Sequence, residues 1–149
     1  MSDEARRAVV AALRGLAGSG DFRDRADAGR ALASFAADPE ARVTLVDLVL
    51  DARDTFVTRV TAEALFRRHD VAGLSVVASA FGRADANRAD WIHTALRDVV
   101  TVFGGERDAA VRDCEALTQD PDEHVRNGAA VLIDTLTEIN PILTAPQEF

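Results

Sequence analysis

The sequence predicts an all-α protein in which about four pairs of helices stack into an alpha-alpha superhelix. Four stretches of similar sequence support this prediction, and they begin at Asp21, Asp54, Asp85 and Asp122. Within each stretch, apolar residues recur with the period of an α-helix. Runs of alternating β-branched residues bounded by turns, which would indicate strands, do not occur in the chain. The pattern is therefore that of a helical repeat.

Each stretch carries its apolar residues at the same distances from its first aspartate. Seven positions after the aspartate stand Ala28, Thr61, Ile92 and Ala129, and eleven positions after it stand Leu32, Leu65, Leu96 and Ile133. These two positions share one face of a helix, so we expect small residues at position 7 to allow close approach and bulky ones at position 11 to fill the core. The starts are 33, 31 and 37 residues apart. That length suits a unit of two short helices that must stack on its neighbours.

Residues that start and stop helices divide the chain into units. Side chains able to cap a helix N-terminus stand in order at Ser2, Asp21, Asp38, Asp54, Asp70 and Asp122. Residues that end helices stand at Gly18–Gly20, Gly82, Gly104–Gly105 and Asn140–Pro141. We expect the fourth helix to run to about His69 and the seventh to begin at Glu106. The units then span about residues 3–37, 38–69, 70–103 and 105–139 of a single domain, with a C-terminal tail at 140–149.

The repeated pattern resembles the HEAT-like family of α-solenoid repeats, of the type found in phycobilisome lyases. The pattern D-x-x-[VD]-[RT]-x-x-[AT]-[AG]-x-[AL]-[LI] is clearest at Asp122–Ile133 and Asp21–Leu32, and it extends over about four units. The second copy has Thr58 at the arginine position, and the third has Arg88 and Ala89 in place of valine and arginine. The resemblance implies a fold and leaves the function open, because repeat families share one architecture across many tasks.

Length and charge set limits on the function. The chain has 149 residues, of which 17 are basic and all arginine, and its net charge is −8. An acidic surface disfavours nucleic acid and anionic membranes and favours a basic protein partner. No apolar run is long enough to span a bilayer, and the N-terminus lacks the apolar core of a signal peptide. We therefore expect a cytoplasmic protein that does not contact membranes.

We expect no catalytic residue, metal site or cofactor. The three histidines His69, His93 and His124 fall in different units and lack the spacing of metal ligands. The single cysteine, Cys114, excludes an internal disulfide and a cysteine zinc cluster. It stands on an apolar stripe, which is typical of a small core residue. No glycine-rich stretch continues into the Lys-Ser or Lys-Thr of a phosphate-binding loop.

The second helix of each unit is the candidate partner-binding surface, because in HEAT-like solenoids that helix lines the concave side. Residues beside its buried stripe form what we call the second-helix face: Arg30, Phe56, Arg59, Glu63, Asp90, Trp91, Thr94 and Asn127. Mixed charge around two aromatic residues is typical of a protein-binding groove. The alternative is that Phe56 and Trp91 only seal the joint between the second and third units.

The sequence favours a non-enzymatic protein-interaction module or scaffold that uses this concave face. One version neutralises a basic partner, as an immunity protein does to a nuclease toxin. A first alternative is nucleic-acid binding on the same face, as in HEAT-like DNA glycosylases, although the net charge of −8 and the interleaved acidic residues oppose it. A second alternative is an enzyme accessory role resembling that of phycobilin lyases, for which no residue set in the chain provides support.

Overall fold

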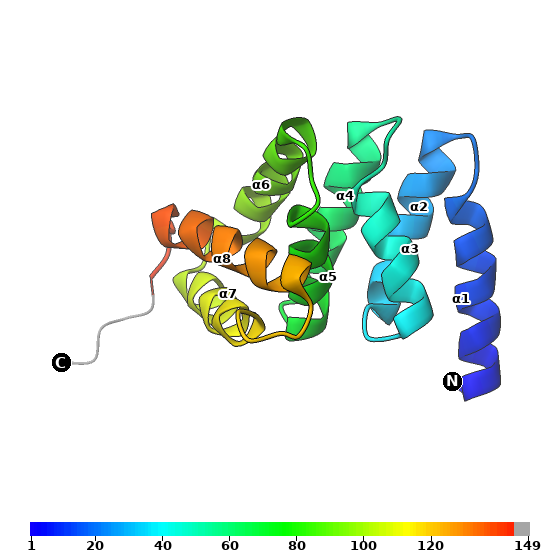
Figure 1. Cartoon of the computed structure of the whole chain (residues 1–149), viewed down its shortest axis with the longest axis horizontal. Helices are drawn as coiled ribbons and strands as arrows, with labels where there is room; N and C mark the ends of the chain where they lie inside the picture. The colour runs from blue at the N-terminus through cyan, green and yellow to red at the C-terminus, as the bar shows by residue number, and fades with distance from the viewer. Residues whose placement is uncertain (145–149) are drawn as a thin grey trace.

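The computed structural model describes residues 1–144 and is helical throughout (Figure 1). Its elements are α1 (Asp3–Ala17), α2 (Phe22–Leu32), the 3-10 helix η1 (Ala33–Phe35), α3 (Pro39–Val49), α4 (Thr55–Phe66), α5 (Val71–Phe81), α6 (Ala86–Val100), α7 (Gly104–Leu117) and α8 (Glu123–Glu138). In the described part of the chain the only extended pairing is an isolated bridge between Phe103 and Leu143. The prediction of an all-α fold is confirmed. None of the helices in this range has the length and apolar character needed to span a bilayer.

Aspartate side chains cap most of the helix N-termini. In six helices an aspartate accepts a hydrogen bond from a backbone N–H of the first turn, at Asp21, Asp38, Asp54, Asp70, Asp85 and Asp122. Ser2 does the same for α1 by accepting from the N–H of Ala5. These bonds satisfy N–H groups that have no partner within the helix. The helix starts expected at Ser2, Asp21, Asp38, Asp54, Asp70 and Asp122 are confirmed, and the cap at Asp85 was not predicted.

Two expected boundaries were wrong. The helix α4 ends at Phe66 and not near His69, which adopts the left-handed conformation with φ of 53° in the turn that follows. The helix α7 begins at Gly104 and not at Glu106. The preceding turn is held by the C-terminal segment, because Leu143 donates to the carbonyl of Val102 (2.7 Å) and accepts from the N–H of Gly104 (2.7 Å). The end of the expected tail, residues 145–149, lies outside the described residues.

The first six helices form two rows (Figure 1). Helices α1, α3 and α5 pack in one row, and α2, α4 and α6 pack in a second row against them. The rows enclose a continuous apolar core, whose largest fully buried side chains include Leu32, Leu45, Leu65, Ile92 and Leu96. Helices α2 and α4 approach closely at Gly29, where a Cβ atom would lie 2.1 Å from Oγ1 of Thr61. Gly29 directly follows Ala28, the small residue expected at position 7, which is also fully buried.

The helix α8 departs from this regular arrangement. It packs against α5 and α7 instead of extending the row of α6, and it crosses in front of α5 in Figure 1. The crossing is close, because a Cβ atom on Gly128 would lie 1.8 Å from the carbonyl oxygen of Ala78. The buried position also shifts, since Leu132 is fully buried while Ile133, at position 11, is only partly buried. The fourth unit therefore repeats the sequence pattern without repeating the packing.

Arginine four positions after the repeat aspartate has the same contacts in the first and fourth copies. Arg25 donates from Nη1 to the carbonyls of Ser19 and Gly20, both at 3.1 Å. Arg126 donates from Nη1 to the carbonyls of Asp120 and Pro121, at 2.8 and 2.9 Å. In both copies these are the two residues just before the repeat aspartate. The side chain thus fixes the turn that leads into the second helix.

Arg25 also forms a buried ion pair with Asp51, and the two side chains are 4% and 7% exposed. Nε of Arg25 lies 2.7 Å from Oδ2 of Asp51, and the backbone N–H groups of Arg53 and Asp54 donate to the same carboxylate. Burial alone would raise the pKa of Asp51, but these hydrogen bonds outweigh it, and the pKa lies below its ordinary value. In the third copy, Arg88 reaches across to the carbonyl of Asp51 at 2.9 Å. Asp51 therefore contacts three of the repeated stretches, two through its carboxylate and the third through its backbone carbonyl.

Candidate partner-binding surface

A groove between α2 and α4 brings together half of the second-helix face. Four predicted residues line it, namely Arg30, Phe56, Arg59 and Glu63, together with Val60, Ala64 and Arg67. The groove has a volume of about 290 Å3 and is open to solvent. It forms where the exposed sides of two neighbouring helices of the same row meet. The stretch from Phe56 to Arg67 supplies most of the lining because α4 presents one side of its surface at every third or fourth residue.

The groove holds one carboxylate among three guanidinium groups. Oε1 of Glu63 accepts from Nη2 of Arg67 at 2.8 Å, and Oε2 lies 4.0 Å from Nε of Arg59. Nε of Arg59 is buried and has no hydrogen-bond partner among residues 1–144. Arg30 contacts Asp27 on its own helix, at 3.3 Å. The charge inside the groove is therefore positive, in contrast to the chain as a whole.

Phe56 contributes the aromatic surface of the groove. Its side chain is 39% exposed, and its ring meets the edge of the Phe22 ring at a centroid distance of 5.8 Å and an interplanar angle of 87°. Because Phe22 begins α2, this contact seals the joint between the first and second units, and not the joint between the second and third. The ring is partly packed and partly available, since sealing the joint leaves more than a third of it exposed.

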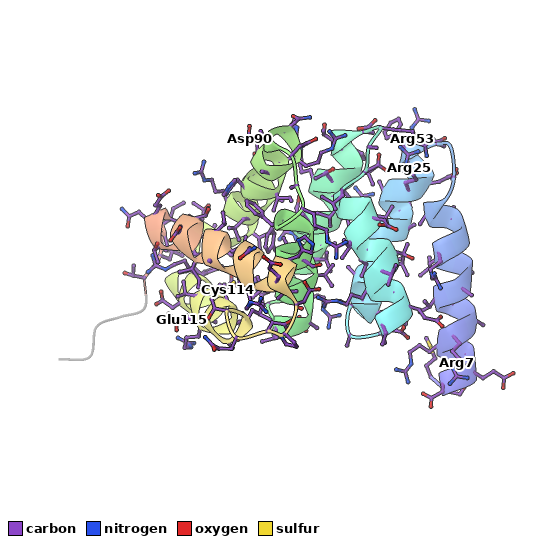
Figure 2. The ribbon with its side chains drawn as sticks, in the orientation of Figure 1. Arg7, Arg25, Arg53, Asp90, Cys114 and Glu115 are labelled. Atoms are coloured by element: carbon purple, nitrogen blue, oxygen red, sulfur yellow. The ribbon has the colours of Figure 1, made fainter. Side chains whose placement is uncertain are left out.

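The remaining predicted residues lie outside the groove. Asp90 and Thr94 are exposed on α6, where the Thr94 hydroxyl donates to the carbonyl of Asp90 at 3.0 Å, and Trp91 is half-buried beside them. Figure 2 shows Asp90 near the N-terminal end of α6, in the same row as α4. Asn127 is exposed on α8. The expected alignment of all four second helices does not extend to Asn127, because α8 leaves the row.

The nucleophilic and metal-ligating residue types do not gather into a site within residues 1–144. Cys114 is buried among α7 core residues, and burial raises the pKa of its thiol to about 12 (Figure 2). A thiol with that pKa stays protonated at neutral pH and is a poor nucleophile. No group of three or more histidine, cysteine, aspartate or glutamate side chains in this range is placed to hold a metal ion.

His93 is held by α8. Its Nδ1 lies 3.0 Å from the hydroxyl oxygen of Thr135, and its ring meets the edge of the Phe81 ring at 4.9 Å. Burial lowers the pKa of His93, and the nearby charge of Arg97 lowers it further. These contacts connect α6 with α5 and α8. The position of the His93 side chain is therefore explained by packing where α5, α6 and α8 meet.

A second cavity was not predicted from the sequence. It lies between α4, α5, α6 and α7, has a volume of about 180 Å3 and is lined mainly by apolar side chains. The sequence signal for it is the pair Ala109–Ala110 between Glu106 and Asp113 on one side of α7. Small residues at core-facing positions leave space that leucine or isoleucine would fill.

Comparison with known proteins adds no assignment to this geometry. No protein-family model, curated protein or solved structure matches the chain. The residues of the groove and of the apolar cavity therefore carry the functional argument.

Proposed function

We propose that this chain is a non-enzymatic protein-interaction module with HEAT-like repeats, and that it binds a protein segment along the exposed sides of α2, α4 and α6. The observation that carries the proposal is the groove between α2 and α4. It places a half-exposed aromatic ring beside an arginine whose Nε lacks a partner among the described residues. Aromatic and arginine side chains in partly desolvated pockets are the usual anchors of protein interfaces.

The charge of the groove indicates what the contacting segment carries. Three arginines and one glutamate line the groove, so a carboxylate that enters it meets an excess of positive charge, and the Arg59 side chain is 42% exposed to it. The net charge of −8 acts at longer range and favours a partner that is basic as a whole. We therefore propose a partner whose contact segment combines an apolar side chain for Phe56 with an acidic one for Arg59.

The test begins by locating a partner at the groove. A photo-crosslinking phenylalanine analogue is placed at position 56 in one variant and at the exposed position 103 in a control variant. Both variants are irradiated in a lysate of the native cells. A protein that is crosslinked from position 56 and not from position 103 is the partner bound at the groove. The affinity of that purified protein is then measured for Arg59→Glu and for Arg7→Glu, an equally large charge change on the exposed surface of α1 (Figure 2). We expect Arg59→Glu to weaken binding by about tenfold or more.

A second comparison distinguishes direct contact with the second-helix face from a long-range electrostatic effect of the protein's net charge. Glu63→Arg and Asp90→Arg lie on α4 and α6, whereas Asp47→Arg and Glu115→Arg make the same change on the exposed sides of α3 and α7. If the α3 and α7 variants change the affinity and the α4 and α6 variants do not, the assignment of this face is wrong. Binding of duplex DNA that falls steeply with salt and is lost in Arg59→Glu would instead support the nucleic-acid alternative.

A further inference from the structure

We propose that the apolar cavity between α4, α5, α6 and α7 binds a small organic cation. In this proposal an aromatic or branched aliphatic body fills the cavity, and an ammonium group lies at its mouth beside the carboxylate of Glu106, while Asp113, about two turns further along α7, adds negative charge. The site is separate from the groove between α2 and α4, so the proposal does not depend on protein binding.

The wall of the cavity is apolar and already formed. Phe66, Leu74, Leu96 and Val100 line it from α4, α5 and α6, and each of them is buried. Its volume of about 180 Å3 is enough for a single ring, since an apolar cavity of roughly 150 Å3 holds benzene. A space of this size in a core is normally filled by side chains, because protein interiors are close-packed. The cavity is therefore matched to a ligand body the size of one six-membered ring.

The fourth side of the cavity explains why it is left open. Glu106, Ala109, Ala110 and Asp113 follow one another at the spacing of one helix face and present that face of α7 to the cavity. The two alanines are too short to reach Leu96 and Val100 across the space. Among the described residues, α8 does not contribute to the lining, and it packs on α5 and α7. The cavity thus results from the small residues that α7 presents to it.

The mouth of the cavity is acidic. Glu106 and Asp113 stand at the two ends of the alanine pair, and Nε2 of His69 lies 3.9 Å from Oε1 of Glu106. His69 is held there by its left-handed backbone and by a hydrogen bond from its N–H to the carbonyl of Phe66, at 3.0 Å. No arginine is among the described residues that line the cavity, so two carboxylates face one imidazole. This charge favours a ligand with a positive group and disfavours one with a carboxylate.

Three probes of one shape test the ligand class. Benzylamine, benzyl alcohol and benzoate share a ring and differ in charge. We expect benzylamine to bind with a Kd on the order of 1 mM or below, and benzoate to bind about tenfold more weakly or not at all. Binding is measured by calorimetry and by chemical-shift changes of the Ala109 and Ala110 methyl groups. Failure of benzylamine to bind at about 10 mM would overturn the proposal, and equal affinity for benzoate would overturn its cationic part.

Variants of α7 test the place of binding. Ala110→Leu fills the cavity and should abolish binding of benzylamine and benzyl alcohol alike. Glu106→Gln keeps the wall, so it should weaken benzylamine about fivefold while leaving benzyl alcohol unchanged. Glu115→Gln removes the same charge from an exposed position of the same helix and should change neither affinity. If Ala110→Leu does not fold, the two glutamate variants still decide, because equal effects of Glu106→Gln and Glu115→Gln would refute binding at this mouth.

Discussion

Replacement of Gly128 by alanine should destabilise the protein, although alanine is the better helix former. Gly128 lies inside α8, where a Cβ atom would be 1.8 Å from the carbonyl oxygen of Ala78 in α5. Ordinary van der Waals contact begins at 3.4 Å, so the two helices would have to separate by about 1.6 Å at this point. Such a separation would loosen the packing of α8 on the core.

The magnitude follows from two opposing terms. Extra atoms in a packed core typically cost about 1–3 kcal/mol, and the cost here should lie at the upper end or beyond, because the obstructing atom belongs to the backbone and cannot rotate away. The gain in helix propensity from glycine to alanine is about 1 kcal/mol and offsets part of that cost. We expect Gly128→Ala to lower the free energy of unfolding by about 2 kcal/mol or more.

The assay is urea denaturation followed by circular dichroism, with Gly15→Ala as the matched control. Gly15 lies inside α1 and a Cβ atom there would meet nothing within 4 Å. The control should therefore raise the free energy of unfolding by about 0.5–1 kcal/mol. If Gly128→Ala is as stable as wild type, α8 does not cross α5 at the described distance, and the departure of α8 from the row is refuted.

Three further predictions concern the core. Leu65→Ala should lower the free energy of unfolding by about 2–5 kcal/mol. Leu13→Ala in the terminal helix should lower it by less, since Leu65 is fully buried and Leu13 is not. Equal losses for the two variants in urea denaturation would contradict this expectation. Asp51→Asn should cost about 3 kcal/mol or more, because the buried Arg25 loses its counter-charge. Since the folded-state pKa of Asp51 is lowered, this difference should be fully present at pH 7 and shrink as the pH falls below the ordinary value of 3.8; a difference that grows in acid would contradict the sign. Thr58→Val should leave thermal stability unchanged or raise it by up to about 1 kcal/mol, because the buried Thr58 hydroxyl has no partner within residues 1–144; a loss above that size would indicate a bound water or another partner.

Helix starts could be predicted because their cause is local. An aspartate side chain reaches only the N–H groups two or three residues ahead, so the sequence alone contains both partners of the bond. The start of α7 could not be predicted in this way. The turn before Gly104 is fixed by Leu143, which is distant in sequence and belongs to the C-terminal segment. A glycine pair stops a helix in isolation, but here a distant backbone contact places the same pair in the first turn of the next one.

The candidate groove was predictable to the extent that neighbouring units repeat each other. Arg30, Phe56, Arg59 and Glu63 share a groove because α2 and α4 lie side by side in the same row. The Phe22–Phe56 contact forms because α2 and α4 are neighbours. The spacing of residues within one helix does not predict which helices become neighbours. The sequence therefore indicated the exposed face and did not indicate which joint the aromatic ring would seal.

One feature of the sequence, a glycine at position 128, indicates the position of α8. Its significance becomes clear only from the packing of α8 on α5. Six positions after the repeat aspartate stand Asp27, Val60, Trp91 and Gly128, so the fourth copy has lost its side chain there. Only the crossing on Ala78 shows why, since any Cβ atom at this position would collide with the backbone of α5. The apolar cavity lies between α6 and the Ala109–Ala110 pair of α7, and α7 packs on α8. A larger residue at position 128 would force α8 away from α5, and the shape of that cavity would then change through α7, which packs on α8. Benzylamine affinity measured in Gly128→Ala should accordingly fall together with stability, whereas in Gly15→Ala it should stay at the wild-type value.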